Sequence, residues 1–370
     1  MRRHQCKVDR LLKGRTLLCR DPLNLHKKTW FKYPLLLCVT LLFCYIQKEK
    51  SLLHQHYQRL VNEPDQVKAP SYRVHPNQRD KLDSKIPRTT FVTLTAGTQY
   101  HQAYPKNYHF IIDVGDVCES STPFLVLMVP VAPNNVAARN AIRSTWGKKK
   151  VVQGKKVLTL FMLGLAEGPD LWQESELHGD LIQSDFRDTY LNLTIKTTVI
   201  MEWLATRCPT ATYGMKIDSD VFLNVDNLVL MLQKPSIPQN NYLTGRLMRN
   251  QQVIRSKSSK WYVSEEMYPD LEYPLYTLGM GYVFSGDLPC KLVEISRSIK
   301  PFHIEDAYVG MCMKKLGIAI TSPPDPSQFR TQSTKFDRCT YSKIITSILA
   351  SPEQLLSFWM NLKLMPGLPC

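Results

Sequence analysis

The stretch YGMKIDSDVFLNV, residues 213–225, decides how the rest of the chain is interpreted. Most of its residues are apolar and several are β-branched, a pattern that predicts a buried strand. Asp218 and Asp220 interrupt this pattern, with only Ser219 between them. Burying a carboxylate without a cationic partner is costly, so two aspartates in a buried strand need an explanation. Because alternate residues of a strand point to the same side, we expect the two carboxylates to lie together.

Two carboxylates at this spacing predict a site for a divalent metal ion. Ligands of open α/β sheets bind beyond the carboxyl ends of strands. Oxygen ligands suit Mn²⁺ or Mg²⁺, the ions that bridge proteins to diphosphates. We therefore interpret Asp218 and Asp220 as metal ligands; the alternative is a solvated pair of aspartates in a loop. An EF-hand calcium loop is excluded because Leu223 stands where that loop requires glycine.

Apolar runs and helical patterns alternate on both sides of this stretch. Runs of buried-strand type are TPFLVLMVPVAP (122–133) and KVLTLFMLG (156–164); helical patterns are RNAIRSTWG (139–147, ending at Gly147) and TIKTTVIMEWLATRC (194–208). This alternation predicts an α/β domain with a largely parallel sheet flanked by helices. SPEQLLSFWMNLK (351–363) adds a helix with a capping-box start. No glycine-rich dinucleotide or Walker motif follows the first strand.

The positive charge of the chain is concentrated at its N-terminus. Residues 1–50 carry a net +9 of the total +15, so we expect no nucleic-acid partner for the body of the protein. The uncharged segment 33–47 follows this basic stretch. It is short for a membrane span, and a signal peptide is the alternative. The positive-inside rule favours a single-pass type II anchor.

This orientation predicts four parts: a cytosolic tail (1–32), a transmembrane signal-anchor (33–47), a lumenal stem (48–121) and a catalytic domain (122–370). Asn192 begins an Asn-Leu-Thr triplet, a glycosylation acceptor in a lumenal protein. Six cysteines follow the anchor and predict disulfides, although the sequence does not choose among their pairings. The absence of a Cys-x-x-Cys motif argues against structural zinc.

A second acidic pair, Glu305 and Asp306, opens a helical pattern near residue 305. A carboxylate close to the metal site would suit a general base, whereas the helix dipole alone also favours acids there. Between the two acidic pairs lies an aromatic segment in which Trp261 and Tyr262 could stack on sugar rings; the alternative is that such aromatic residues are core. Gly279 and Gly281 suggest close backbone approach to a ligand or a strand.

Six blocks, in this order, resemble the β-1,3-galactosyltransferases, a family that includes β-1,3-N-acetylglucosaminyltransferases. They are RNAIRSTWG, DFRDTYLNLTIKT, MKIDSDVFLNVDNL, KWYVSEEMYP with YPLYTLGMGYVFSGD, IEDAYVGMC and FDRCTYSKIITS. The resemblance runs from about residue 123 to 363. It implies a GT-A-type nucleotide-sugar-binding fold in a type II enzyme of the Golgi membrane.

The resemblance also implies an inverting transfer of galactose from UDP-galactose to a glycan on a glycoprotein or glycolipid. Asp218 and Asp220 match the family's D-x-D, with Asp220 the direct ligand of Mn²⁺, and Asp306 matches its base. Arg139 and Arg143 match an R-x-A-I-R block, with either a nucleotide-supporting or a structural role. We assign the D-x-D with Ser219 and these arginines to the nucleotide. The acceptor is assigned to Trp261, Tyr262, Gly279, Gly281 and Glu305.

Two departures from the family pattern keep other functions open. Thr277, Leu278 and Met280 stand where the family has Cys, Ser and Thr, and Ile348 stands where the family has a histidine that resembles a metal ligand. Ile348 cannot coordinate a metal, so water or donor oxygens complete the coordination or binding is weak. The alternatives are an N-acetylglucosaminyltransferase that uses UDP-GlcNAc and a catalytically silent Golgi binding module with the same fold.

Overall fold

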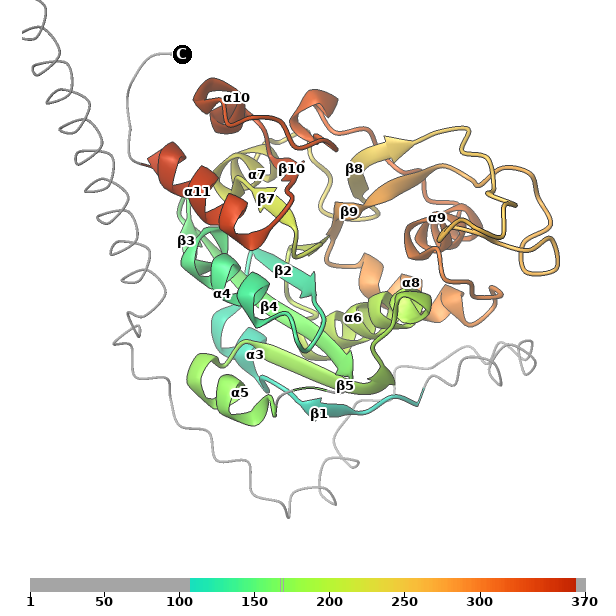
Figure 1. The fold of residues 1–370 in the computed structure, drawn as a ribbon, viewed down its shortest axis with the longest axis horizontal. Helices are drawn as coiled ribbons and strands as arrows, with labels where there is room; N and C mark the ends of the chain where they lie inside the picture. The colour runs from blue at the N-terminus through green and yellow to red at the C-terminus, as the bar shows by residue number, and fades with distance from the viewer. Residues whose placement is uncertain (1–106, 167, 169, 364–370) are drawn as a thin grey trace, which may run out of the picture. The chain divides into compact units, whose positions relative to one another are not determined.

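A sheet of eight strands lies at the centre of the computed structural model, which describes residues 107–166, 168 and 170–363 (Figure 1). Its middle consists of four parallel strands, which in spatial order are β5 (Leu181–Arg187), β4 (Lys155–Leu165), β2 (Leu125–Pro130) and β6 (Tyr213–Ile217). Antiparallel strands flank them: β1 (Phe110–Ile112) beside β5, β9 (Tyr276–Ser285) beside β6, β8 (Leu243–Met248) beside β9, and β3 (Val151–Val152) beside β4.

Helices cover the two faces of the sheet (Figure 1). Val126 and Met128 of β2 share one apolar core with α6 (Leu193–Arg207), α8 (Leu288–Ser296) and α9 (Glu305–Leu316). On the other face lie α4 (Val136–Ser144) and α11 (Pro352–Lys363). The remaining elements are α3 (Val117–Ser121), α5 (Trp172–His178), α7 (Val225–Leu232), α10 (Arg338–Lys343), β7 (Val221–Leu223), β10 (Thr346–Ile348), and the 3-10 turns η1 (Trp146–Lys148), η2 (Tyr190–Asn192) and η3 (Pro326–Gln328).

The central strands are buried on both faces, as parallel strands between helix layers must be. Residues 125–129 of β2 and all of β6 are buried. The mixed α/β fold with a mostly parallel centre is thereby confirmed, together with the strands predicted at 122–133 and 156–164 and the helix at 194–208.

The predicted strand over 213–225 is wrong as one element. It divides into β6 and β7, which belong to different sheets: β6 lies between β2 and β9, and β7 pairs with β10. Asp218, Ser219 and Asp220 form the turn between them. The apolar residues on both sides are buried, but they enter two separate sheets, which a local pattern does not reveal.

Of two predicted helix ends, the start of α11 is confirmed and the end of α4 is wrong. The start of α11 is confirmed, because the Gln354 N–H donates to Ser351 Oγ (3.3 Å) and Gln354 Oε1 accepts from the Ala350 N–H (2.6 Å). Helix α4, however, ends at Ser144 rather than at Gly147. Gly147 lies in η1, where a Cβ atom would stand only 2.7 Å from Ile142 Cγ2, so glycine is needed for packing.

The folded domain extends further toward the N-terminus than the predicted boundary at residue 122. Strand β1 pairs with β5 and helix α3 carries the buried Cys118, both inside the segment predicted as stem. Three strand residues and a five-residue helix are too short to produce a periodic pattern. The predicted cytosolic tail and signal-anchor lie outside the described residues. Among the residues that the structure does describe, none of the helices has the length and apolarity to cross a bilayer.

One disulfide, Cys118–Cys208, joins α3 to the end of α6 across 90 residues of sequence. Cys339 is also disulfide-bonded, and the thiol of Cys290 is free and exposed. Disulfides within this domain were predicted, but their pairing was not.

Removal of the disulfide by Cys118→Ser with Cys208→Ser should lower the free energy of unfolding by about 2–5 kcal/mol, because a long loop of the unfolded chain is no longer closed. Chemical unfolding of the detergent-solubilised full chain measures this. Cys290→Ser is the control and should leave stability unchanged. Equal stability of the double variant and the wild type would contradict the prediction.

Candidate active site

The turn 218–220 lies at the carboxyl end of β6, the edge where α/β sheets bind ligands. The Asp218 N–H donates to Met280 O of β9 (3.0 Å), and the Val221 N–H closes the turn on Asp218 O (3.3 Å). Asp218 is half-buried and Asp220 is exposed. The expectation of two buried carboxylates is therefore wrong; the strand itself is fully buried, and the acids stand just beyond it.

The buried charge of this strand is a cation, Lys216, which the sequence analysis did not consider. Its ammonium donates to Asp218 Oδ1 (2.7 Å), Gly279 O (2.6 Å) and Glu305 Oε1 (2.8 Å), from β6, β9 and α9. Burial lowers the pKa of Lys216, but the negative charges of Asp218 and Glu305 outweigh burial and leave the pKa raised. The ammonium therefore stays charged. A lysine two residues before the D-x-D in an otherwise apolar strand was the available signal.

Glu305 is the counter-ion of this lysine rather than an exposed acceptor contact. Its side chain is buried, and its second oxygen accepts from Thr197 Oγ1 (3.0 Å) and Tyr282 OH (3.3 Å). Both carboxylate oxygens thus already have protein donors. These contacts favour a structural role for Glu305, while its assignment to the acceptor stays a prediction.

Asp306, the neighbouring acid, has a different environment. Its carboxylate accepts from the Gly279 N–H (3.0 Å) and the Ala307 N–H (2.9 Å). Burial and the adjacent charge of Glu305 raise its pKa from 3.8 to about 7. A carboxyl group with this pKa can exchange a proton near neutral pH, which a general base requires.

The two glycines of β9 approach other groups closely, as predicted, but differ in their surroundings. A Cβ atom on Gly279 would stand 2.8 Å from Glu305 Oε1, so only glycine lets the acidic pair reach the strand. Gly281 is buried and pairs with Ile217 of β6, where a Cβ atom would meet Met215 Cε at 3.1 Å. The close approach at Gly281 is therefore to a neighbouring strand and its side chains.

An exposed aromatic group lies near Asp306. The Trp261 side chain is 49% exposed and Tyr190 42%. The Lys260 ammonium lies 4.7 Å from the Trp261 ring centre and 5.9 Å from that of Tyr190. The pKa of Tyr190 is raised by burial and by the charge of Asp306, which places its phenol near the proposed base. Tyr190 was missed by the sequence analysis, although it lies in the second family block.

The other aromatic residues of this segment separate into two kinds. Tyr262 is half-buried beside the exposed Trp261. Tyr268, Tyr273 and Tyr276 are buried in the core beneath α9, and the Tyr273 ring stacks on Phe302 at 5.8 Å between ring centres. The structural alternative stated above is correct for these three residues.

Arg139 and Arg143 are held by acids from neighbouring elements. Arg139 is fully buried and bonds both oxygens of Glu174 (2.6 Å each), and Arg143 bonds Asp180 (2.8 and 2.7 Å) and Glu174 (2.8 Å). These ion pairs anchor α4 to α5 and β5. They support the structural alternative for both arginines, while the nucleotide role stays a prediction.

A further ion pair, between Lys196 and Asp188, lies at the carboxyl ends of the parallel strands. The buried Lys196 of α6 donates to Asp188 Oδ2 (2.7 Å) and Val131 O (2.9 Å), and the Gly164 N–H donates to the same Asp188 oxygen (2.9 Å). Burial lowers the pKa of Lys196 and Asp188 opposes the shift. This contact joins the ends of β2, β4 and β5 beside the site.

Ile348 lies next to the D-x-D turn. It pairs with Val221, and the Leu349 N–H donates to Asp220 O (2.8 Å). The pKa of Asp220 is raised by burial and by the charge of Asp218. The two carboxylates fit a hard divalent ion whose other ligands are water or phosphate oxygens. Across the described residues, no cluster of three His, Cys, Asp or Glu side chains could hold a metal.

The predicted glycosylation site lies at the start of α6. Asn192 is half-buried and its amide donates to Arg187 O (2.8 Å), while Thr194 is buried and bonds Phe302 O (2.5 Å). Attachment of a glycan to this nitrogen would require the loss of the first of these bonds.

The chain is similar in sequence to known galactosyltransferases. The family model described as galactosyltransferase matches residues 137–324. Human beta-1,3-galactosyltransferase 2 is 40% identical over 284 residues, 73% of this chain and 67% of that protein. Mouse beta-1,3-galactosyltransferase 1 is 40% identical over 271 residues, 72% of this chain and 82% of the relative. A solved structure, of a glycosyltransferase involved in glycosylation of the major capsid of PBCV-1, aligns with a TM-score of 0.37 and 12% identity over 64% of this chain and 98% of that one.

The extent of the sequence matches defines the protein as an enzyme, a glycosyltransferase. The chain belongs to the galactosyltransferase family, which confirms the resemblance found in the sequence blocks. Membership implies a nucleotide-sugar donor and a glycan acceptor, and it supports transfer of a galactosyl group.

Lys216→Met should lower the free energy of unfolding by about 3–5 kcal/mol, because it leaves Glu305 buried without a cation. Lys216→Met with Glu305→Gln should recover part of this loss, since the uncompensated charge is gone. Chemical unfolding measures both variants, and exposed Lys335→Met is the control. Wild-type stability of the single variant would contradict the assigned ion pair.

Proposed function

We propose that the protein transfers galactose from UDP-galactose to a sugar hydroxyl of a glycoprotein or glycolipid, forming a β-1,3 linkage with inversion. The observation that carries this proposal is Asp306: a carboxyl group with a pKa of about 7, held by the Gly279 N–H, whose charge also raises the pKa of the exposed Tyr190. The names of the relatives that match most of the chain support the sugar and the linkage.

In this mechanism Asp306 removes the proton from the acceptor hydroxyl as the oxygen attacks C1 of the donor sugar. The bond from C1 to the UDP oxygen breaks on the opposite face, so an α-linked donor yields a β-linked product. Trp261, Tyr262 and Tyr190 supply surfaces for the acceptor ring. Glu305 and Lys216 make no contact with substrate; they hold the strand β9 and helix α9 that position Asp306.

Asp218 and Asp220 would hold Mn²⁺, with Asp220 the more accessible ligand. When bound, the ion offsets negative charge on the departing diphosphate. The backbone of Gly279 and the Lys216 ion pairs keep the turn 218–220 in place at the end of β6, which keeps the carboxylate pair next to the donor position. Because Ile348 adds no ligand, we propose that water or donor oxygens complete the coordination.

The protein is also proposed to work as a single-pass type II protein of the Golgi membrane. The support comes from the sequence: residues 1–32 hold ten Lys and Arg against two Asp, a net +8, directly before the uncharged segment 33–47. A protease-protection experiment on the full chain in microsomes tests this, since the domain that begins before residue 122 should be protected until detergent is added.

One observation favours a second candidate, a silent binding module with the same fold. Ile348 occupies the strand position next to Asp220 and offers no metal ligand. The two candidates are separated by turnover. The full chain is incubated with Mn²⁺ and UDP-galactose, UDP-N-acetylglucosamine or UDP-glucose, and UDP release is recorded with and without β-linked acceptors. The transferase is supported if UDP release depends on the acceptor and occurs with UDP-galactose but with neither of the other donors. The binding module is supported if no donor is turned over and UDP binding is undetectable.

Asp306→Asn should reduce turnover by about 10²–10⁴-fold, because amides do not accept the proton. In the wild type, turnover should rise with pH up to about 7 and then level off, as the carboxyl loses its proton. The pKa of this carboxyl is higher in the folded protein than in the unfolded chain. The free energy of unfolding therefore falls as the pH rises from the ordinary pKa of 3.8 to about 7.

At pH 8 the free energy of unfolding of Asp306→Asn should therefore exceed that of the wild type by about 1–3 kcal/mol. A pH series of rates and unfolding curves measures both effects. An active variant, or a rate that does not change between pH 5 and 8, would exclude Asp306 as the base.

Ile348→His should lower the Kd for Mn²⁺ by about tenfold, equivalent to about 1.4 kcal/mol, because it adds an imidazole beside Asp220. Asp220→Asn should raise the same Kd. Free Mn²⁺ measured by electron paramagnetic resonance gives both values without turnover, and Ile348→Leu is the control. Unchanged Kd values in the histidine and asparagine variants would refute a metal site at this turn.

A further inference from the structure

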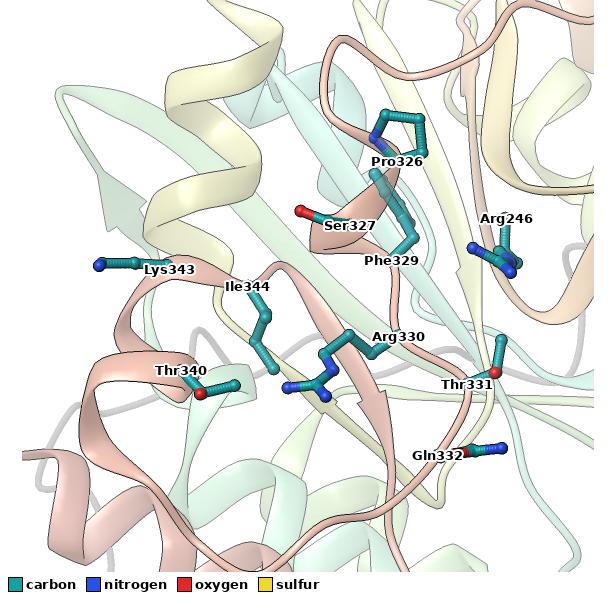
Figure 2. Close-up of a pocket in the computed structure, with 10 residues that line it drawn as sticks. All are labelled: Arg246, Pro326, Ser327, Phe329, Arg330, Thr331, Gln332, Thr340, Lys343 and Ile344. Carbon is teal, nitrogen blue, oxygen red and sulfur yellow. The ribbon is translucent and has the colours of Figure 1, made fainter.

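A cavity of about 560 Å³ lies outside the residues assigned so far (Figure 2). It is formed by strand β8, the segment that follows η3, and the end of α10. Pockets for small ligands typically measure about 300–1,000 Å³, so one or two sugar rings fit within this size range.

The described lining of this cavity is basic. Arg246 comes from β8 and Arg330 from the segment after η3, and none of the described lining residues is acidic. Lys343 also lines the cavity, although it points away from the two arginines in the view of Figure 2. The pKa of Asp337 is lowered by hydrogen bonds from Thr340 and, to a smaller extent, by the charge of Lys343. The two arginines therefore carry the charge of the cavity.

Neither guanidinium group is paired within the part of the chain that the structure describes. Arg330 is half-buried and Arg246 is exposed, and among the described residues no ion pair or side-chain hydrogen bond involves either of them. A planar guanidinium presents a fork of donors that matches a carboxylate, sulfate or phosphate group. Two of them in one cavity without acids favour an anionic ligand.

The cavity adjoins the proposed active site through two strands. Strand β8 pairs with β9, which carries Gly279 and Gly281. On the other side, the Arg330 N–H donates to Thr346 O of β10 (3.0 Å), and Ser347 Oγ donates to Gln332 O (3.2 Å). Strand β10 in turn pairs with β7, directly after Asp220. Since paired strands lie about 4.8 Å apart, each wall is about 5–10 Å from the strands of the site.

We propose that the cavity between Arg246 and Arg330 binds an anionic group, a carboxylate or a sulfate ester, on the acceptor glycan. This inference rests on the proposed function, because it names the acceptor class of the same enzyme. The donor diphosphate is already assigned to the D-x-D turn, so the acceptor is the substrate left for this cavity. Pro326 and Ile344 offer apolar carbon to a sugar ring, and Thr331 and Gln332 offer polar groups.

Binding of matched sugars to the full chain in detergent tests the charge preference without turnover. The probes are phenyl β-N-acetylglucosaminide and its 6-O-sulfate, and phenyl β-glucoside and the corresponding glucuronide, titrated by ligand-observed NMR in the presence of UDP and Mn²⁺. We expect the anionic member of at least one pair to bind at least tenfold more tightly. Arg246→Gln with Arg330→Gln should abolish this preference, and Arg249→Gln, an exposed arginine just after β8, should keep it. The proposal would be overturned if, in both pairs, the anionic and the neutral sugar bound the wild type with equal affinity.

Kinetics with UDP-galactose separate the two substrates. We expect the double variant to raise KM for an anionic acceptor at least tenfold, with KM for UDP-galactose unchanged. A raised KM for UDP-galactose with an unchanged acceptor KM would assign the cavity to the donor phosphates and overturn the proposal. Absence of turnover in the wild type, with the charge preference in binding intact, would instead be a failure of the proposed transferase.

Discussion

The ammonium group of Lys216 is the contact on which the site depends. It is buried and charged, so it must be surrounded by acceptors, and it finds them in the turn after β6, in strand β9 and in helix α9. One cation thereby sets the positions of three segments that are distant in sequence. Asp218, Gly279 and the acidic pair at the start of α9 are held together by the same charge.

The adjacent acids Glu305 and Asp306 have different surroundings because only Glu305 contacts this cation. Glu305 neutralises Lys216 and is saturated by hydroxyl donors. Asp306 receives only two backbone N–H groups, and the charge of Glu305 next to it makes ionisation harder. The structure thus holds one carboxylate as the partner of a buried lysine and raises the pKa of its neighbour to about 7.

The proposed acceptor subsite and the unusual residue Ile348 are parts of one structural unit. Strand β10 carries Ile348 beside Asp220, and on its other side it holds the segment with Arg330. Among the described residues, one short strand therefore lies between the turn with Asp220 and a cavity whose lining includes no acid.

The sequence by itself determined the alternation of strands and helices, the start of α11, the acidic pairs and the family. These are local properties, because periodic burial and capping depend on residues a few positions apart. It did not determine that β6 and β7 enter different sheets, or that Lys216 meets Glu305, 89 residues away. The placement of Ile348 beside Asp220 and of Arg246 with Arg330 likewise came only from the tertiary structure. Such contacts depend on the order of strands in a sheet, which no local pattern of residues encodes.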